Sequence, residues 1–158
     1  MVMVKVRHAK VADVPHMLRI INGYAEKGLM LPRSLNQIYD HLRDFVVAEE
    51  DGRVKGCGAL YVVWEDLGEI RSVAVEASER GKGIGSKIVR YLLDEAKEIE
   101  LRKVFVLTYQ KEFFARFGFK VVPKDTLPHK VWKDCLDCVK FPNCDEIAMA
   151  MELDGGGS

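Results

Sequence analysis

The stretch EASERGKGIGSKIVRYLLDEAK combines three glycines and several basic residues with the start of a helical pattern. Successive backbone N–H groups at a helix start point into one concavity, and the helix dipole adds positive potential there. Glycines allow the backbone to approach a pyrophosphate without a Cβ in the way. The stretch therefore predicts a site for a polyanion, built from Arg80, Gly81, Lys82, Gly83, Ile84, Gly85 and Ser86.

Two common phosphate-binding turns do not fit this spacing. A Walker turn requires G-x-x-x-x-G-K-[ST], whereas Gly85 is followed by Ser86 and then Lys87. A dinucleotide-binding turn requires G-x-G-x-x-G and an acidic residue after the next strand, but its third glycine position is Ser86 and VFVLT contains no acid. The pattern that fits is R-x-x-G-x-G. A solvated turn is the alternative, but a strand before the turn and an amphipathic helix after it favour phosphate binding.

A second cluster of reactive residues lies near the end of the chain. The segment HKVWKDCLDCVKFPNC contains His129, Cys135, Cys138 and Cys144. Three thiols and an imidazole are a zinc ligand set, but a second C-x2-C is absent and the last gap is short. Reduced, partly buried thiols and a redox pair at Cys135 and Cys138 stay open as alternatives. Cys57 is expected to be a small core residue.

The elements that position these residues follow from hydrophobic periodicity. We expect a helix after Asp13, a second helix opened by a Ser34–Gln37 capping box, and a hairpin turning at Asp51-Gly52. The second helix should bury a stripe of Leu35, Ile38, Tyr39 and Leu42, and the helix after the glycine turn should bury a face ending at Ile99. Strands are expected at VKVRH, GEIRSVAVE, KVFVLT, FKVV and DEIAMAMEL, with a short helix at KEFFARFG.

This order predicts an α/β (α+β) fold, a mixed and mostly antiparallel sheet with helices on both faces. Residues 1–153 form one expected domain, and residues 154–158 a flexible tail. The 24 basic and 24 acidic residues balance, which argues against a nucleic-acid partner. No apolar run is long enough to span a bilayer, and the start of the chain lacks signal-peptide features. We therefore expect no membrane partner and a cytoplasmic location; a homodimer is left open.

The run IRSVAVEASERGKGIGSKIV resembles the acetyl-CoA-binding motif of the GNAT acetyltransferases, and FFARFGF resembles their last helix and strand. A narrower resemblance covers roughly residues 28–130. There GLMLPRS, GEIRSVAV and VFVLT are similar to the acetyltransferase domain of N-acetylglutamate synthases, enzymes of arginine biosynthesis. The long enzymes carry an amino-acid-kinase-like domain in front, so the chain is expected to match the short, stand-alone form.

The resemblance implies roles for particular residues. Backbone groups of Val73 and Val75 would pair with the pantetheine arm of acetyl-CoA, and the turn from Arg80 to Ser86 would hold the pyrophosphate. Arg33 would bind a substrate carboxylate, and Glu69 would accept the amine proton through water. In the long enzymes an Arg and a Ser follow the strand that corresponds to VFVLT; here Tyr109, Gln110 and Lys111 follow, and Lys111 is the expected substitute. From the residues themselves, Arg33 and Arg71 could each pair with one carboxylate of a dicarboxylic amino acid.

The implied reaction is direct attack of the α-amine of L-glutamate on the thioester, with no metal required. Many superfamily members place a tyrosine acid at the position of Phe114, so Tyr109 or a water is the expected substitute. Two alternatives remain: an N-acetyltransferase acting on another small amine or a protein amine, and a non-catalytic acyl-CoA sensor.

Overall fold

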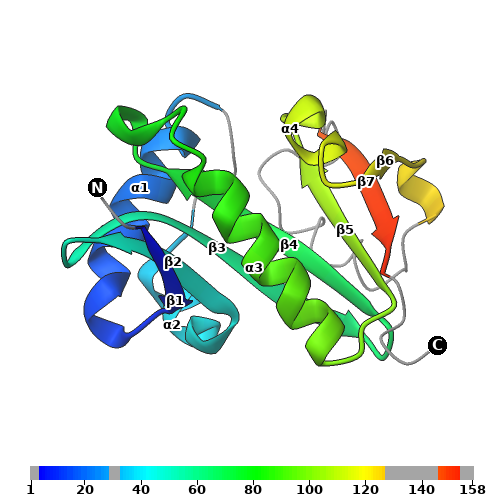
Figure 1. Ribbon diagram of the computed structural model, residues 1–158, viewed down its shortest axis with the longest axis horizontal. Helices are drawn as coiled ribbons and strands as arrows, with labels where there is room; N and C mark the ends of the chain where they lie inside the picture. Colours follow the sequence, from blue (N-terminus) through cyan, green and yellow to red (C-terminus); the bar gives the residue numbers. More distant parts are fainter. Residues whose placement is uncertain (1–3, 29–32, 127–145, 154–158) are drawn as a thin grey trace.

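The computed structural model describes residues 4–28, 33–126 and 146–153, which form a single mixed sheet with helices on both faces (Figure 1). The sheet has seven strands in the order β1-β2-β3-β4-β5-β7-β6. The strands are β1 (Lys5–His8), β2 (Phe45–Glu50), β3 (Arg53–Trp64), β4 (Leu67–Val75), β5 (Lys103–Thr108), β6 (Lys120–Val121) and β7 (Ile147–Glu152). The α-helices are α1 (Val14–Ala25), α2 (Leu35–Asp40), α3 (Ile84–Glu98) and α4 (Lys111–Ala115).

Every pairing in the sheet is antiparallel except that of β4 with β5. That parallel pair needs a crossover, and α3 supplies it. The hairpin between β2 and β3 turns at Asp51 and Gly52, whose φ angles of 52° and 77° are those of a favoured two-residue turn. The mixed, mostly antiparallel sheet predicted from the sequence is confirmed.

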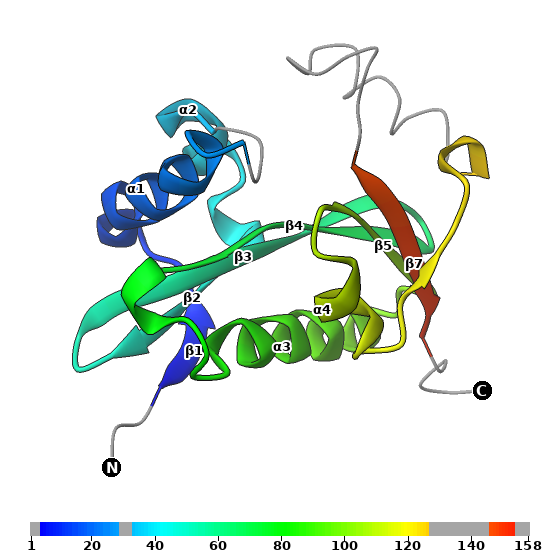
Figure 2. The same cartoon turned by 90° about the horizontal axis from the view of Figure 1, so that it is seen from above.

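The helices lie on opposite faces of the sheet. Figure 2 shows α1 and α2 on one face and α3 with α4 on the other. On the first face, fully buried Met17, Ile21 and Ile38 pack with side chains of β2 and β3. On the second face, Ile88 and Leu92 of α3 pack with side chains of the central strands. The two apolar layers fix the central strands from both sides.

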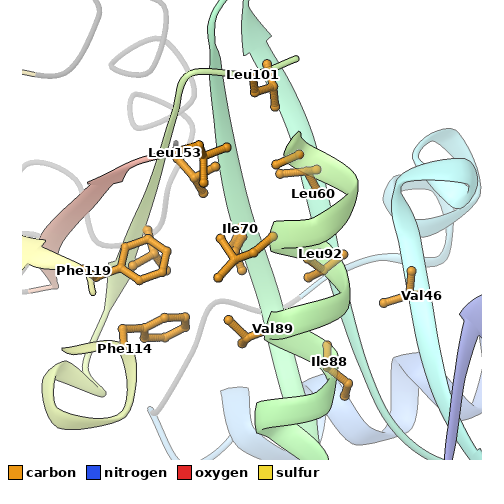
Figure 3. Packing of buried hydrophobic residues seen from close by; sticks show 14 of the residues in the cluster. Val46, Leu60, Ile70, Ile88, Val89, Leu92, Leu101, Phe114, Phe119 and Leu153 are labelled. Carbon is orange, nitrogen blue, oxygen red and sulfur yellow. The ribbon is translucent and has the colours of Figure 1, made fainter. Parts of the chain in front are cut away.

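The layer under α3 is the larger core and includes Leu153, which follows β7 (Figure 3). Gly58 of β3 allows α3 to pack close to the sheet, since a Cβ at this position would lie 2.7 Å from the Cγ2 of Ile88. Phe114 and Phe119 meet edge to face with ring centroids 5.5 Å apart. Both rings are buried beside Val89 and Ile70, which ties α4 to the central sheet.

The sheet opens between β4 and β5. Their parallel register covers only Leu67–Lys103, Gly68–Val104 and Glu69–Phe105. Beyond Glu69, β4 continues to Val75 while β5 diverges from it (Figure 1). The register of β3 with β4 also shifts between Cys57 and Ala59, and Ser72 in this part of β4 has a φ of 57°. Glu69 therefore sits where the two strands separate.

Of the helix features predicted from the sequence, one is confirmed and two are wrong. The Ser34–Gln37 capping box is present and starts α2. The expected stripe on that helix is wrong, because only Ile38 is buried, while Leu35 and Tyr39 are exposed. Ile99, expected on the buried face after the glycine turn, lies beyond the end of α3 and is exposed. In the described part of the chain, no helix is long and apolar enough to cross a membrane.

Candidate active site

The glycine-rich turn adopts the conformation that an anion cradle needs. Gly81 and Gly83 have φ angles of 81° and 79°, and α3 begins at Ile84 directly after Gly83. No side chain caps this helix start, so its first N–H groups are not satisfied in that way. A Cβ added at Gly81 or Gly83 would meet no atom within 4 Å. The glycines are thus required for backbone conformation, and the turn has room for a ligand.

Lys82, in the glycine-rich turn, forms an ion pair within the protein. Glu79 is buried and binds two ammonium groups, Lys55 Nζ at 3.0 Å and Lys82 Nζ at 2.7 Å. Lys82 is the main cause of a lowered pKa for the Glu79 carboxyl. One carboxylate between two ammonium groups leaves this cluster positive. Lys82 therefore adds to the positive electrostatic potential of the turn, although it is ion-paired with Glu79.

Val73 and Val75 are both half-buried on β4, in the part of the strand that has separated from β5. Tyr24 of α1 contacts this strand end, and its hydroxyl donates a hydrogen bond to the carbonyl oxygen of Val75. The same hydroxyl accepts a hydrogen bond of 2.9 Å from Arg80 Nε. The hydroxyl oxygen of Tyr24 thus links α1 to the end of β4 and to the glycine turn.

Glu69 and Arg71 form a buried ion pair at the opening of the sheet. Arg71 Nε donates to Glu69 Oε1 at 2.6 Å, and only 4 % of Glu69 is exposed. The Arg71 guanidinium carbon lies 4.7 Å from the ring centroid of Tyr61, and the His41 ring stacks on Tyr61 at 4.2 Å. Tyr61 is the register partner of Glu69 on β3. Burial raises the pKa of Tyr61, so its hydroxyl stays protonated near neutral pH.

Arg33 joins this cluster from the segment before α2. The side-chain amide of Asn22 holds its backbone from both sides: Arg33 N donates to Asn22 Oδ1 at 3.1 Å, and Asn22 Nδ2 donates to Arg33 O at 3.2 Å. Burial is the main cause that lowers the pKa of Arg33, and the nearby Arg71 lowers it further, while Tyr61 and Glu69 raise it. The Nε of Arg33 is buried and has no hydrogen-bond partner among the described residues.

A buried guanidinium nitrogen without a partner indicates an anion site. Leaving such a donor unpaired in a protein interior costs free energy, and a carboxylate is the ligand that a guanidinium binds best. The sequence-predicted residues Arg33, Glu69 and Arg71 are therefore brought together here. Tyr61 and Asn22 were not predicted: a tyrosine in a buried strand and an asparagine in a helix are also ordinary structural residues, so neither pattern singles them out.

The remaining predicted residues lie around the end of β5. Tyr109 follows this strand directly and is half-buried. Lys111 is exposed and is the first residue of α4. Phe114 belongs to the core under α3. His129, Cys135, Cys138 and Cys144 lie outside the described residues. Within residues 4–28, 33–126 and 146–153, no group of three metal-ligating side chains is gathered.

Comparison with known proteins gives a family match and similar curated proteins. A model of the acetyltransferase (GNAT) family matches residues 15–119. An uncharacterized N-acetyltransferase of Chlorobaculum tepidum is 45% identical over 148 residues, covering 94% of this chain and 96% of that protein. An amino-acid acetyltransferase of Mycobacterium tuberculosis is 48% identical over 117 residues, covering 72% of this chain and 67% of that protein.

Solved structures agree with this match. A Mycobacterium tuberculosis protein crystallised with CoA superimposes with a TM-score of 0.84 and 37% identity, covering 95% of this chain and 99% of that one. N-acetylglutamate synthase from Neisseria gonorrhoeae, complexed with coenzyme A and N-acetyl-glutamate, gives a TM-score of 0.88 and 30% identity. That match covers 96% of this chain but 35% of the larger enzyme. The chain belongs to the GNAT family of acetyltransferases, which take acetyl-CoA as cosubstrate.

Proposed function

We propose that this protein transfers the acetyl group of acetyl-CoA to the α-amine of L-glutamate, the first step of arginine biosynthesis. The observation that carries the proposal is the buried Nε of Arg33, which has no hydrogen-bond partner within the described residues, together with the Glu69–Arg71 pair, whose charges act on Arg33. This arrangement offers positive charge for a carboxylate and a carboxylate base for an amine in one place. An amino acid carries both a carboxylate and an amine.

A dicarboxylic amino acid fits the charges of the cluster better than a simple amine. Arg33 and Arg71 supply two guanidinium groups, and a planar guanidinium binds a carboxylate through two parallel hydrogen bonds. Glu69 already neutralises part of the charge of Arg71. In this proposal Arg33 binds one substrate carboxylate and Arg71, with Lys111 at its side of the site, binds the other.

On the coenzyme side, the turn from Arg80 to Ser86 holds the diphosphate. Its open glycines and the N–H groups at the start of α3 support this placement. The pantetheine arm runs along the free part of β4 and pairs with backbone groups of Val73 and Val75, in the way an added strand would. This path leads the thioester from the turn toward Glu69, where β4 and β5 separate.

Glu69 is the proposed general base. A free α-amine is mostly protonated at pH 7, and removing that proton costs about 3–4 kcal/mol. The hydrogen bond from Arg71 favours the ionised carboxylate, which is the form that accepts a proton. Because Glu69 is buried, we propose that the proton reaches it through a water molecule.

The tetrahedral intermediate needs a donor for its oxyanion and a proton or other stabilisation for the leaving thiolate. A backbone N–H near Val73, on the part of β4 that has separated from β5, is the proposed oxyanion donor. Phe114 has no hydroxyl and its ring is buried in the core. Tyr109, which follows β5, or a water is therefore proposed as the acid.

The relatives support an amino-acid acceptor. The Mycobacterium tuberculosis relative is named an amino-acid acetyltransferase, and the Neisseria gonorrhoeae enzyme was crystallised with N-acetyl-glutamate. The larger enzyme contains a long region that this chain does not match, so its regulation is not carried over. What carries over to the proposal is the acetyltransferase chemistry and the acceptor class.

A thiol-release assay with acetyl-CoA tests the proposal against each amino acid in turn, with polyamines and lysine peptides as other acceptors. We expect turnover with glutamate and a strong preference for glutamate over glutamine, because the amide removes one of the two carboxylates. Preference for another amine would overturn the acceptor assignment. Binding of acetyl-CoA without transfer to any amine would indicate a sensor instead of an enzyme.

A further inference from the structure

Tyr24 lies at an unusual junction for a residue near the end of α1. Its hydroxyl is hydrogen-bonded to the carbonyl oxygen of Val75 at the end of β4 and to Nε of Arg80 in the glycine turn. The Arg80 guanidinium carbon also lies 4.8 Å from the centroid of the Tyr24 ring. A second contact holds the same helix to this connection, since Arg19 Nη1 lies 2.7 Å from Glu76 Oε1.

The direction of the two hydrogen bonds is fixed by chemistry. A carbonyl oxygen only accepts and a guanidinium only donates, so the single hydroxyl proton of Tyr24 must point at Val75. Its oxygen then accepts from Arg80. The hydroxyl thus has one partner on each side, and the partner in the turn is the arginine of the R-x-x-G-x-G pattern.

The hydrogen bond to Tyr24 occupies only the Nε–H donor of Arg80. A guanidinium has five N–H donors, and the Nε–H is taken by Tyr24. The two terminal nitrogens make no hydrogen bond or ion pair with any residue of the described ranges, and the residue is exposed. Four donors in a planar fork therefore remain beside the open glycines, at the position proposed for a diphosphate.

We infer that Tyr24 is a positioning residue for coenzyme A. It holds the Arg80 guanidinium over its ring and by a hydrogen bond to Nε, and so directs the two terminal nitrogens at the diphosphate. Through Val75 the same hydroxyl fixes the strand end along which the pantetheine arm is proposed to run. The inference rests on the proposed placement of the diphosphate and is independent of which amine accepts the acetyl group.

Calorimetric titration of coenzyme A tests the inference with four proteins: wild type, Tyr24→Phe, Arg80→Gln and the double variant. Tyr24→Phe keeps the ring but removes the hydroxyl, and we expect the Kd for coenzyme A to rise about five- to tenfold. Tyr24 acts through Arg80, so in the Arg80→Gln background the additional loss caused by Tyr24→Phe should be markedly smaller. Tyr39→Phe is the matched control, because Tyr39 is exposed and its hydroxyl makes no hydrogen bond within the described part of the chain.

Denaturant unfolding of the same proteins separates positioning from folding. A Tyr24→Phe protein that is folded at the titration temperature and binds coenzyme A as tightly as wild type would overturn the inference. So would losses that add fully in the double variant, because they would show that Tyr24 acts without Arg80. Failure of glutamate as an acceptor leaves these titrations unaffected, since no amine is present in them.

Discussion

Arg33 is the residue on which the acceptor assignment depends most. The residue is half-buried, and its buried Nε has no protein partner within the described residues, which is costly in the absence of a ligand. Asn22 contributes by holding the backbone of Arg33 in place rather than by touching its charge. The sequence showed Arg33 only through its family position; the physical reason for it becomes visible when its surroundings are known.

Replacing Arg33 should separate the two substrates kinetically. In Arg33→Ala we expect the KM for glutamate to rise about ten- to a hundredfold, because a hydrogen-bonded charge pair with a substrate carboxylate is lost. The KM for acetyl-CoA should stay within about twofold, since the glycine turn is untouched. Steady-state kinetics with each substrate varied in turn measures both values. Arg43→Ala is the control at an exposed arginine, and an unchanged glutamate KM in Arg33→Ala would remove the assignment.

Glu69 carries a prediction about pH. In Glu69→Gln we expect kcat with glutamate at neutral pH to fall about a hundredfold, because general-base assistance is lost. The residual rate should then depend on amine that is already neutral and rise about tenfold per pH unit below the amine pKa. The wild-type rate should rise less steeply over the same range.

The control for this pH profile is Glu65→Gln, a change at an exposed glutamate before β4. Its pH profile should match that of wild type. Parallel profiles for Glu69→Gln and wild type would mean that another group removes the proton.

At the scale of the elements, the decisive feature is the connection from β4 to α3. It must leave a strand, make a turn with two left-handed residues and start a helix whose N–H groups face a ligand. The glycine spacing, together with the strand pattern before it and the helical pattern after it, made this connection predictable. The family resemblance implied that backbone groups of Val73 and Val75 would be available to the pantetheine arm. The separation of β4 from β5 depends on pairing across the sheet and so could not be derived from local sequence.

The glycine turn can be tested by a pair of matched substitutions. Gly83→Ala places a Cβ at a φ of 79°, so we expect a loss of about 1–2 kcal/mol in unfolding free energy together with weaker coenzyme A binding. Gly23→Ala lies within α1, where a Cβ meets no atom within 4 Å and φ is not positive, and should stabilise the protein by about 0.5–1 kcal/mol. Urea unfolding measures both, and a Gly83→Ala protein as stable as wild type would contradict the left-handed turn.

At the scale of the whole molecule, the sheet brings α1 and α2 to one face and α3 with α4 to the other (Figure 2). We propose that the two substrates meet where β4 and β5 diverge. Most strands and helices were predictable because their apolar periodicity is clear. The exposed Leu35 and Tyr39 were mispredicted because a six-residue helix buries only a narrow face, here Ile38. Contacts between distant segments, such as Tyr24 with Arg80 and Asn22 with Arg33, have no sequence signature.

A local ion pair joins β1 to the residue that precedes α1 and predicts a pH dependence of stability. Arg7 binds Asp13 through two nitrogens, at 2.7 and 3.0 Å, and this is the main cause that lowers the pKa of Asp13 below its usual value of 3.8. A lowered pKa in the folded state gives stability that is present above pH 3.8 and is lost as the pH falls through the folded-state pKa. Asp13→Asn should therefore cost about 2 kcal/mol at pH 7.

This difference between Asp13→Asn and wild type should shrink as the pH falls from 3.8 through the folded-state pKa, because the carboxyl of the unfolded wild-type chain becomes protonated first and that of the folded protein follows. Urea unfolding at a series of pH values measures it. Asp94→Asn, at an exposed position of α3, is the control and should change little at any pH. A loss for Asp13→Asn that does not vary with pH would show that the ion pair is not its cause.

The most direct test of the account is a crystal structure of the protein with coenzyme A and N-acetylglutamate bound. We predict the diphosphate on the N–H groups of the turn from Arg80 to Ser86, a product carboxylate within hydrogen-bond distance of Arg33 Nε, and the acetylated nitrogen beside Glu69. A diphosphate bound elsewhere, or an Arg33 Nε that the product does not reach, would contradict it.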